Sequence, residues 1–204
     1  MAITLITQNS KLKKTSKELK VNVYNFGIPA YKSASGKLTC PFAKDCVKYC
    51  YAQKGAYIWS NVSPAFEKRY QLTKLPLVFK RMMNSALKRH KVEYLRIHDS
   101  GDFYSLQYRN TWFDIMRENP EVRFYAYTKS VSLFIDDELP ENFDLIYSEG
   151  GKQDNLWDEQ KHRHSRIFSS DEELKMAGYV DASKYDLFAT KWFSKNHKVG
   201  LVFH

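Results

Sequence analysis

Apolar residues recur with helical spacing in two long segments of this chain. In Leu75–His90 they lie three and four positions apart, and Ser105–Glu118 repeats the pattern before it stops at Asn119-Pro120. This spacing places the apolar side chains on one face of an amphipathic helix. Two further helices are predicted from their caps, one starting at Ser63-Pro64 and one at Ser170-Asp-Glu-Glu173.

Short apolar or alternating stretches of strand length lie around the helical segments. The predicted strands are 21–24, 94–98, 122–128, 143–147, 166–168, 185–189 and 199–203. Strands that alternate with helices are typical of repeated β–α units around a parallel sheet. The pattern therefore predicts an α/β fold, a partial (β/α) barrel with mostly parallel strands.

The length and the first residues of the chain set the expected domain organisation. With 204 residues the chain can form one well-buried core, so we expect a single α/β domain over residues 1–204. Residues 1–39 are expected to be a loop-rich lead-in, because Lys11–Lys20 is charged and only weakly periodic and because glycine and proline punctuate residues 27–36. Residues 40–51 come next as a separate loop.

All three cysteines of the chain lie in that loop. Cys40, Cys46 and Cys50 have the spacing C-x5-C-x3-C, and an odd number of thiols would leave one unpaired in any disulfide scheme. Three thiolates from one loop are typical ligands of an iron–sulfur cluster, which leaves one iron open or bound by another residue. We therefore expect a [4Fe-4S] cluster, with His98 as one candidate fourth ligand. Zinc with a distant fourth ligand and three ordinary free thiols are the alternatives.

Polar residues follow four of the predicted strands, as His98-Asp-Ser-Gly-Asp102, Thr128-Lys-Ser130, Ser148-Glu-Gly150 and Ser169-Ser170. The carboxyl ends of parallel strands meet at one edge of the sheet and form the reactive face of β–α folds. The residues expected to contact a small molecule there, next to the open iron, are Asp99, Ser100, Asp102, Lys129 and Glu149, with Glu149 suited to an amine. Ordinary alternatives are a turn or helix cap for Asp102, a solvated side chain for Lys129 and a core position for His98.

Charge and hydropathy narrow the choice of partners. The net charge is +9 with a pI near 9.3, and basic residues bunch at Lys11–Lys20 and Lys80–Lys91. These runs permit nucleic-acid binding, although charged runs on helices are commonly just solvated faces. The sequence has no apolar stretch of transmembrane length and no basic signal-peptide start. We therefore expect no membrane partner and, given the clustered thiols, a reducing cytoplasm.

Four blocks of sequence resemble the phage gene product 88-like family. They are Leu38-Thr-Cys40-Pro, Cys46-x3-Cys50-Tyr-Ala52, Arg96-Ile-His-Asp-Ser-Gly-Asp-Phe103 and Phe124-Tyr-Ala-Tyr-Thr-Lys-Ser130, in that order, within about residues 29–130. The resemblance implies a phage protein that works in the host cytoplasm. It implies an origin more firmly than an activity.

The cysteine motif also resembles, more loosely, that of radical S-adenosylmethionine (SAM) enzymes. There, three cysteines on the loop after the first strand of a partial barrel hold a [4Fe-4S] cluster whose fourth iron binds SAM. Tyr49 beside Cys50 matches an aromatic residue common in their motif, but their usual spacing is C-x3-C-x2-C, and Glu149-Gly-Gly stands late and reversed relative to their Gly-Gly-Glu. The resemblance implies SAM as a second cofactor, near Tyr49.

Two functions therefore stay open. One is an iron–sulfur enzyme, of radical SAM-like type or with another chemistry at an open iron. The other is a non-catalytic protein that a cluster or zinc staples together and that binds a host protein or nucleic acid.

Overall fold

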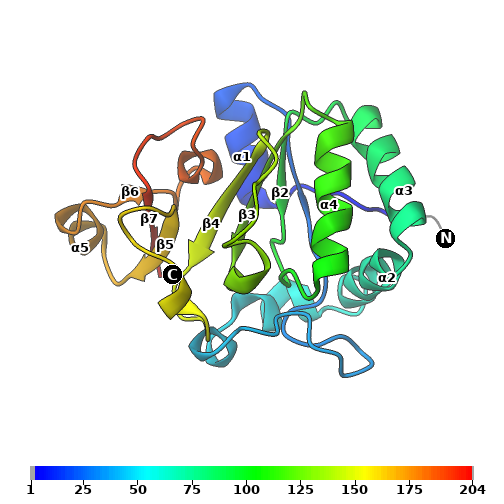
Figure 1. The fold of residues 1–204 in the computed structure, drawn as a ribbon, viewed down its shortest axis with the longest axis horizontal. Helices are drawn as coiled ribbons and strands as arrows, with labels where there is room; N and C mark the ends of the chain where they lie inside the picture. The colour runs from blue at the N-terminus through cyan, green and yellow to red at the C-terminus, as the bar shows by residue number, and fades with distance from the viewer. Residues whose placement is uncertain (1–2, 204) are drawn as a thin grey trace.

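A computed structural model describes residues 3–203 of the chain. Its centre is one sheet of seven strands in the order β1-β2-β3-β4-β5-β7-β6, and all neighbouring strands are parallel. The sheet curls into a half-barrel flanked by helices, which confirms the predicted α/β partial barrel (Figure 1). The strands are β1 (Val23–Phe26), β2 (Tyr94–Ile97), β3 (Arg123–Thr128), β4 (Phe143–Ser148), β5 (His164–Phe168), β6 (Val180–Asp181) and β7 (Lys198–Val202).

The helices lie on both faces of the sheet. Helices α2 (Ser63–Thr73), α3 (Pro76–Arg89) and α4 (Leu106–Glu118) gather on one face, and α1 (Ser10–Leu19) lies on the opposite face (Figure 1). The short helix α5 (Asp171–Met176) packs near β5, β6 and β7. Among residues 3–203, no helix has the length and apolar character needed to cross a membrane.

The core between the sheet and helices α3 and α4 is aromatic. Phe26, Phe79 and Trp112 are fully buried, and the Trp112 ring meets the other two edge-on at centroid distances of 5.3 Å. Fully burying a side chain such as Phe stabilises the fold by about 1.5–3 kcal/mol. Because strand side chains alternate between faces, Tyr125 of β3 instead packs with Leu12 of α1 on the opposite face.

The predicted pattern of elements is confirmed for most of the chain. All four predicted helices and six of the seven predicted strands lie within two residues of the observed ones. The strand predicted at 185–189 is wrong, because Asp186–Ala189 forms a 3-10 turn. This turn buries Leu187 and Ala189 and directs the Asp186 carboxylate to the guanidinium of Arg96 (2.9 Å), a distant contact that the local apolar pattern does not encode.

Helix α1 lies in the segment predicted to be a loop-rich lead-in, so that prediction is wrong for residues 10–19. The side chain of Asn9 caps the helix by accepting a hydrogen bond from the N–H of Leu12 (2.9 Å). Within the helix, Leu12 and Thr15 are the buried residues. Leu12 and Leu19 are the only apolar residues of the helix, too few for a spacing to be recognised, and the helix depends on its contact with the sheet.

Candidate functional site

The connection between β1 and α2 crosses the carboxyl edge of the sheet and carries all three cysteines (Figure 1). We call residues 27–62 the cysteine loop. It contains three 3-10 turns, Asp45–Lys48, Tyr51–Gln53 and Gly55–Ile58. The loop therefore faces the residues that follow the parallel strands, where β–α folds place their functional groups.

Backbone contacts fix the first half of the cysteine loop to the chain that follows β2 and β4. The N–H of Asp102 donates to the carbonyl of Thr39 (2.9 Å), and the N–H of Lys152 donates to the carbonyl of Phe42 (2.8 Å). Ala43 forms an isolated β-bridge with Gly151. These contacts place the loop over the edge on which the predicted site residues lie.

All three cysteines are free and half-buried, and Cys40 lies deeper than Cys46. The sulfur of Cys40 accepts a hydrogen bond from the N–H of Tyr31 (3.3 Å). Burial raises the pKa of the Cys40 thiol, and the charges of Asp102, Cys50 and Cys46 raise it further. Cys40 is therefore a protonated thiol at neutral pH unless a cation displaces its proton.

Cys46 lies within reach of a cation. Burial raises the pKa of the Cys46 thiol, Lys129 opposes this effect, and Cys50 adds to it. The thiols thus lie within electrostatic reach of one another. Within residues 3–203, however, no three His, Cys, Asp or Glu side chains form a group that could hold a metal ion. The structure brings the sulfurs into one neighbourhood without converging them on one point.

Asp102 links the ends of two strands. Its carboxylate is buried and accepts hydrogen bonds from the hydroxyl of Thr128 (2.6 Å), the N–H of Lys129 (2.9 Å) and the N–H of Phe103 (2.7 Å). Burial raises the pKa of Asp102, and these hydrogen bonds oppose that rise. Asp102 therefore links the chain after β2 to the end of β3. Its negative charge also raises the pKa of the Cys40 and Cys46 thiols.

Lys129 and Glu149 point to different partners. The ammonium of Lys129 donates to the hydroxyl of Ser148 (2.7 Å) and to the backbone carbonyl of Glu149 (2.7 Å). The carboxylate of Glu149 is exposed and pairs with the guanidinium of Arg166 (2.6 Å). The Lys129 ammonium is thus held by acceptors at the end of β4, within electrostatic reach of Cys46, whereas the carboxylate that we expected to bind an amine already pairs with Arg166.

Asp99 is buried under the second half of the cysteine loop. One of its carboxylate oxygens accepts a long hydrogen bond from the hydroxyl of Tyr57 (3.4 Å), and the other has no hydrogen-bond partner within the described residues. The Tyr51 hydroxyl donates to the backbone carbonyl of Asp99. A Cβ on Gly27 would lie 2.1 Å from the unpartnered oxygen, so only glycine leaves room for this carboxylate. Burial raises the pKa of Asp99.

His98 belongs to the aromatic core on the α4 side of the sheet. One ring nitrogen lies 2.9 Å from the Tyr108 hydroxyl, and the ring meets Phe103 edge-on at 4.6 Å. Its backbone has a φ of 66°, which is rare for a residue with a side chain. Burial, with a contribution from Arg96, lowers the pKa of His98 to about 3. This environment is that of a neutral core histidine.

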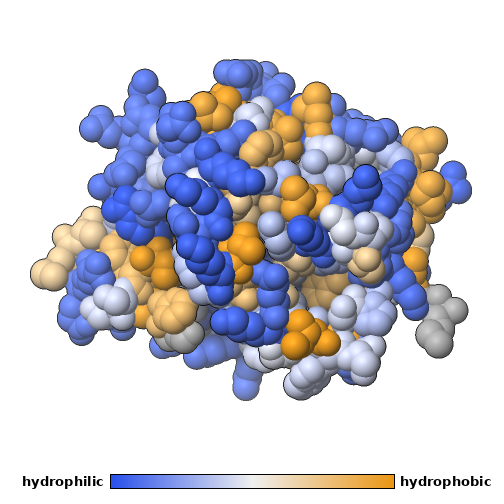
Figure 2. All heavy atoms as spheres, turned by 90° about the horizontal axis from the view of Figure 1, so that it is seen from below, coloured by the Kyte–Doolittle hydropathy of each residue, from blue (hydrophilic) through white to orange (hydrophobic). Residues whose placement is uncertain are grey.

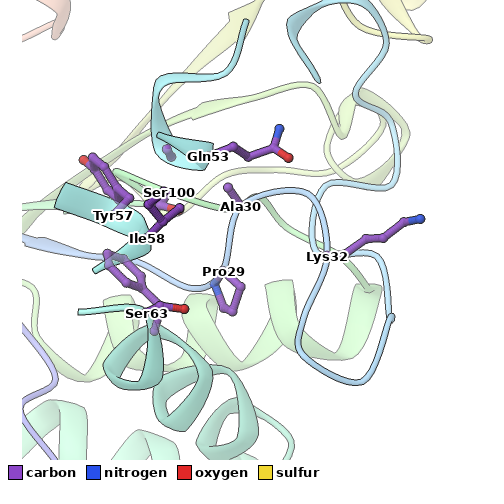
Figure 3. A pocket seen from close by; sticks show the side chains of 10 residues that line it. Pro29, Ala30, Lys32, Gln53, Tyr57, Ile58, Ser63 and Ser100 are labelled. Carbon is purple, nitrogen blue, oxygen red and sulfur yellow. The ribbon is translucent and has the colours of Figure 1, made fainter. Parts of the chain in front are cut away.

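The cysteine loop supplies most of the lining of a pocket of about 250 Å³ (Figure 3). Of the residues predicted to contact a small molecule, Ser100 lines it. Lys32, Gln53, Tyr57 and Ser63 also line it, and none of the four was predicted, because no sequence motif gives them a binding role. Their position close to the cysteines in sequence was the available signal. The remaining candidate, Tyr49, is exposed on the loop surface.

The fold and this edge define a class of protein: an α/β half-barrel with a three-cysteine loop across the carboxyl ends of its strands. The sequence model of the gene product 88 family matches residues 4–201, and the chain belongs to that family.

Two relatives come from mycobacteriophages. The chain is 28% identical to the gene 88 protein of Mycobacterium phage L5 over 137 residues, which cover 61% of this chain and 56% of the relative. It is 26% identical to the gene 88 protein of Mycobacterium phage D29 over 137 residues, which cover 61% and 55%. The chain thus spans a little over half the length of the curated relatives it matches. No solved structure matches it. These comparisons support the resemblance to gene product 88 and give no support to the one with radical SAM enzymes.

Proposed function

We propose that this gene product 88 family protein is an iron–sulfur protein in which Cys40, Cys46 and Cys50 bind three irons of a [4Fe-4S] cluster. The observation that carries the proposal is the position of all three thiols on one loop, within electrostatic reach of one another, at the carboxyl edge of a parallel half-barrel. Thiolates are soft ligands that favour iron–sulfur clusters and zinc over hard cations such as magnesium.

Three cysteine thiolates are suitable ligands for an iron–sulfur cluster. Binding requires a movement of the cysteine loop that brings the three sulfurs together. Asp45–Lys48, which contains Cys46, is a single 3-10 turn without a buried residue, so its movement would disrupt little packing. Because the pKa of Cys40 is raised, loading must release protons from the thiols. Loading is therefore expected to be more favourable at higher pH.

A bound cluster would supply one-electron transfer or a Lewis-acidic iron at its fourth position. The pocket supports access for a small molecule on the same side of the fold, because Ala52 and Gln53, two and three residues after Cys50, line it. Ser100 would offer a hydroxyl to such a molecule, and Lys32 a positive charge. SAM is the candidate that the resemblance of the cysteine motif implies.

Anaerobic reconstitution with iron and sulfide tests the proposal. We expect close to four irons and four sulfides per chain, with broad visible absorbance, and a loss of most of that iron in Cys46→Ser. A colourless protein with one zinc per chain would instead establish the zinc-stapled alternative. A folded protein that binds neither metal would refute both. Electron paramagnetic resonance of the reduced, loaded protein before and after addition of SAM tests whether SAM binds the cluster. A change in the cluster's spectrum indicates binding, and an unchanged spectrum indicates that the fourth iron binds a different ligand.

A further inference from the structure

The cysteine loop exposes large aromatic and apolar side chains to solvent. Tyr49, Tyr51, Ile58 and Trp59 are between 42% and 63% exposed. Exposed groups of this kind on one surface commonly mark an interaction site. The loop lies on the lower side of the molecule in Figure 1, and Figure 2 looks directly onto that side.

Positive charge surrounds these side chains. The cysteine loop, residues 27–62, contains five lysines (Lys32, Lys37, Lys44, Lys48 and Lys54) and a single acidic residue, Asp45, so it carries +4 of the total +9. All five lysines are exposed, and Lys48 lies 3.9 Å from Asp45 in a solvent-exposed ion pair of little strength. Hydrophilic side chains with apolar ones between them cover this side of the molecule in Figure 2.

The two basic runs at Lys11–Lys20 and Lys80–Lys91 lack this combination of charge and exposed apolar side chains. Residues 10–20 and 80–91 are fully described, and neither contains an exposed large aromatic or aliphatic side chain. Their charge is also partly compensated, because Lys11 pairs with Asp186 (2.9 Å) and Lys80 pairs with Glu118 (2.6 Å). Compared with these two runs, the cysteine loop is better suited to bind a ligand that carries both negative charges and flat apolar rings.

We propose that the exposed face of the cysteine loop binds single-stranded nucleic acid. Trp59 and Tyr49 provide surfaces on which bases stack, and Lys44, Lys48 and Lys54 contact the phosphates. Bases stack on aromatic side chains only when they are unpaired, which selects single strands over duplex. The proposal does not depend on a bound cluster, since it uses none of the thiols.

Fluorescence anisotropy with a labelled oligo-dT of about 20 nucleotides and a matched duplex tests this proposal. We expect the single strand to bind more tightly than the duplex. Trp59→Ala weakens binding by about 5- to 150-fold, the loss expected for one stacked base, and Trp59→Phe keeps most of the affinity. The triple change of Lys44, Lys48 and Lys54 to Gln lowers the slope of log affinity against log salt by about 2.

The matched control is Lys13, Lys14 and Lys17 of α1, all exposed, changed to Gln together. This variant loses the same charge on α1, which packs on a face of the sheet and is not part of the cysteine loop, and we expect an unchanged salt slope. Three results would overturn the proposal: equal weakening by the two triple variants, equal binding of the duplex, or no binding of the single strand at low salt. Circular dichroism confirms that each variant is folded.

Discussion

The hydroxyl of Thr128, at the end of β3, donates a hydrogen bond of 2.6 Å to the buried carboxylate of Asp102, which follows β2. Two neighbouring parallel strands are thereby joined directly beneath the cysteine loop. Since Asp102 also donates its N–H to Thr39, the same residue holds the loop to the sheet. Asp102 therefore connects β2, β3 and the cysteine loop at the carboxyl edge of the sheet.

Thr128→Val should destabilise the protein by about 2–3 kcal/mol, because it leaves a buried carboxylate without one of its donors. Thr128→Ser keeps the hydroxyl and loses one buried methyl group, so its cost should stay near 1 kcal/mol. Urea unfolding of the two variants measures the difference. Equal losses of stability would show that the hydrogen bond to Asp102 contributes nothing.

Gly27→Ala should destabilise the protein by about 1–3 kcal/mol, since the new Cβ would lie 2.1 Å from a carboxylate oxygen of Asp99 and 2.6 Å from the Phe66 ring. In an Asp99→Ala background the first of these two clashes is absent, and the same change should cost less. Thermal unfolding of the four proteins forms a double-mutant cycle. A coupling free energy of zero would contradict the assigned contact.

Asp186→Asn should destabilise the protein at neutral pH by about 3–5 kcal/mol, because it leaves Arg96 and Lys11 without their buried carboxylate. Burial by itself would raise the pKa of Asp186, but Arg96, Lys11 and the Tyr125 hydroxyl lower it to about 2 from an ordinary value of 3.8. A lowered carboxyl pKa stabilises the fold above the unfolded value, and this stability is lost as the pH falls from about 4 to about 2.

The difference between wild type and Asp186→Asn should therefore shrink in that acid range, which denaturant unfolding at several pH values can follow. Asp114→Asn is the matched control, because its pair with Arg117 (3.5 Å) is exposed. We expect that variant to stay within about 0.5 kcal/mol of wild type. A difference for Asp186→Asn that is constant from neutral to acid pH would contradict the assignment.

His98 should make the protein lose stability below pH 6.5. The pKa of His98 is lowered from 6.5 to about 3. Between these two pH values the imidazole is protonated in the unfolded state and neutral in the native state. Stability from this residue is fully present above about 6.5 and falls by about 2 kcal/mol between there and pH 5. Urea unfolding of wild type and His98→Asn isolates the effect, since Asn tolerates the positive φ. Identical pH profiles of the two proteins would show that His98 is not buried in its neutral form.

Cys40 should react slowly with a maleimide in the metal-free protein at neutral pH. Burial and the nearby Asp102 raise the pKa of its thiol, and only the thiolate is nucleophilic. We expect a rate at least about tenfold below that of the same cysteine in urea, measured by mass spectrometry of the labelled peptides. Loading with iron and sulfide should protect all three cysteines. A fast reaction of Cys40 in the folded metal-free protein would contradict its placement.

The fold was predictable from local patterns because its elements are strongly periodic. Leu75–His90 alternates apolar and polar residues at helical spacing, and 122–128 and 143–147 are apolar enough to be buried strands. The elements that were missed or misassigned depend on partners far away in sequence. Helix α1 packs against the sheet through Leu12. The 3-10 turn at Asp186 is stabilised by the ion pair between Asp186 and Arg96, which are 90 residues apart in the sequence.

The site was predictable only in outline. Asp102 and Lys129, chosen by the rule that parallel strands end at one edge, lie within electrostatic reach of Cys46, and Asp99 contacts Tyr51 and Tyr57 of the cysteine loop. The rule could not tell which of the predicted residues already have partners. Glu149 pairs with Arg166, and the pocket beside Ser100 is formed by loop residues whose contacts are set by tertiary packing.

Mössbauer spectroscopy of the protein reconstituted with iron-57 under anaerobic conditions tests the central claim most directly. Three thiolate-bound irons and one iron without a cysteine ligand should give signals in a ratio of about three to one, and a guest at the fourth iron should shift the minor signal. Absence of a cluster signal from the folded, reduced protein would contradict the assignment of Cys40, Cys46 and Cys50 as its ligands.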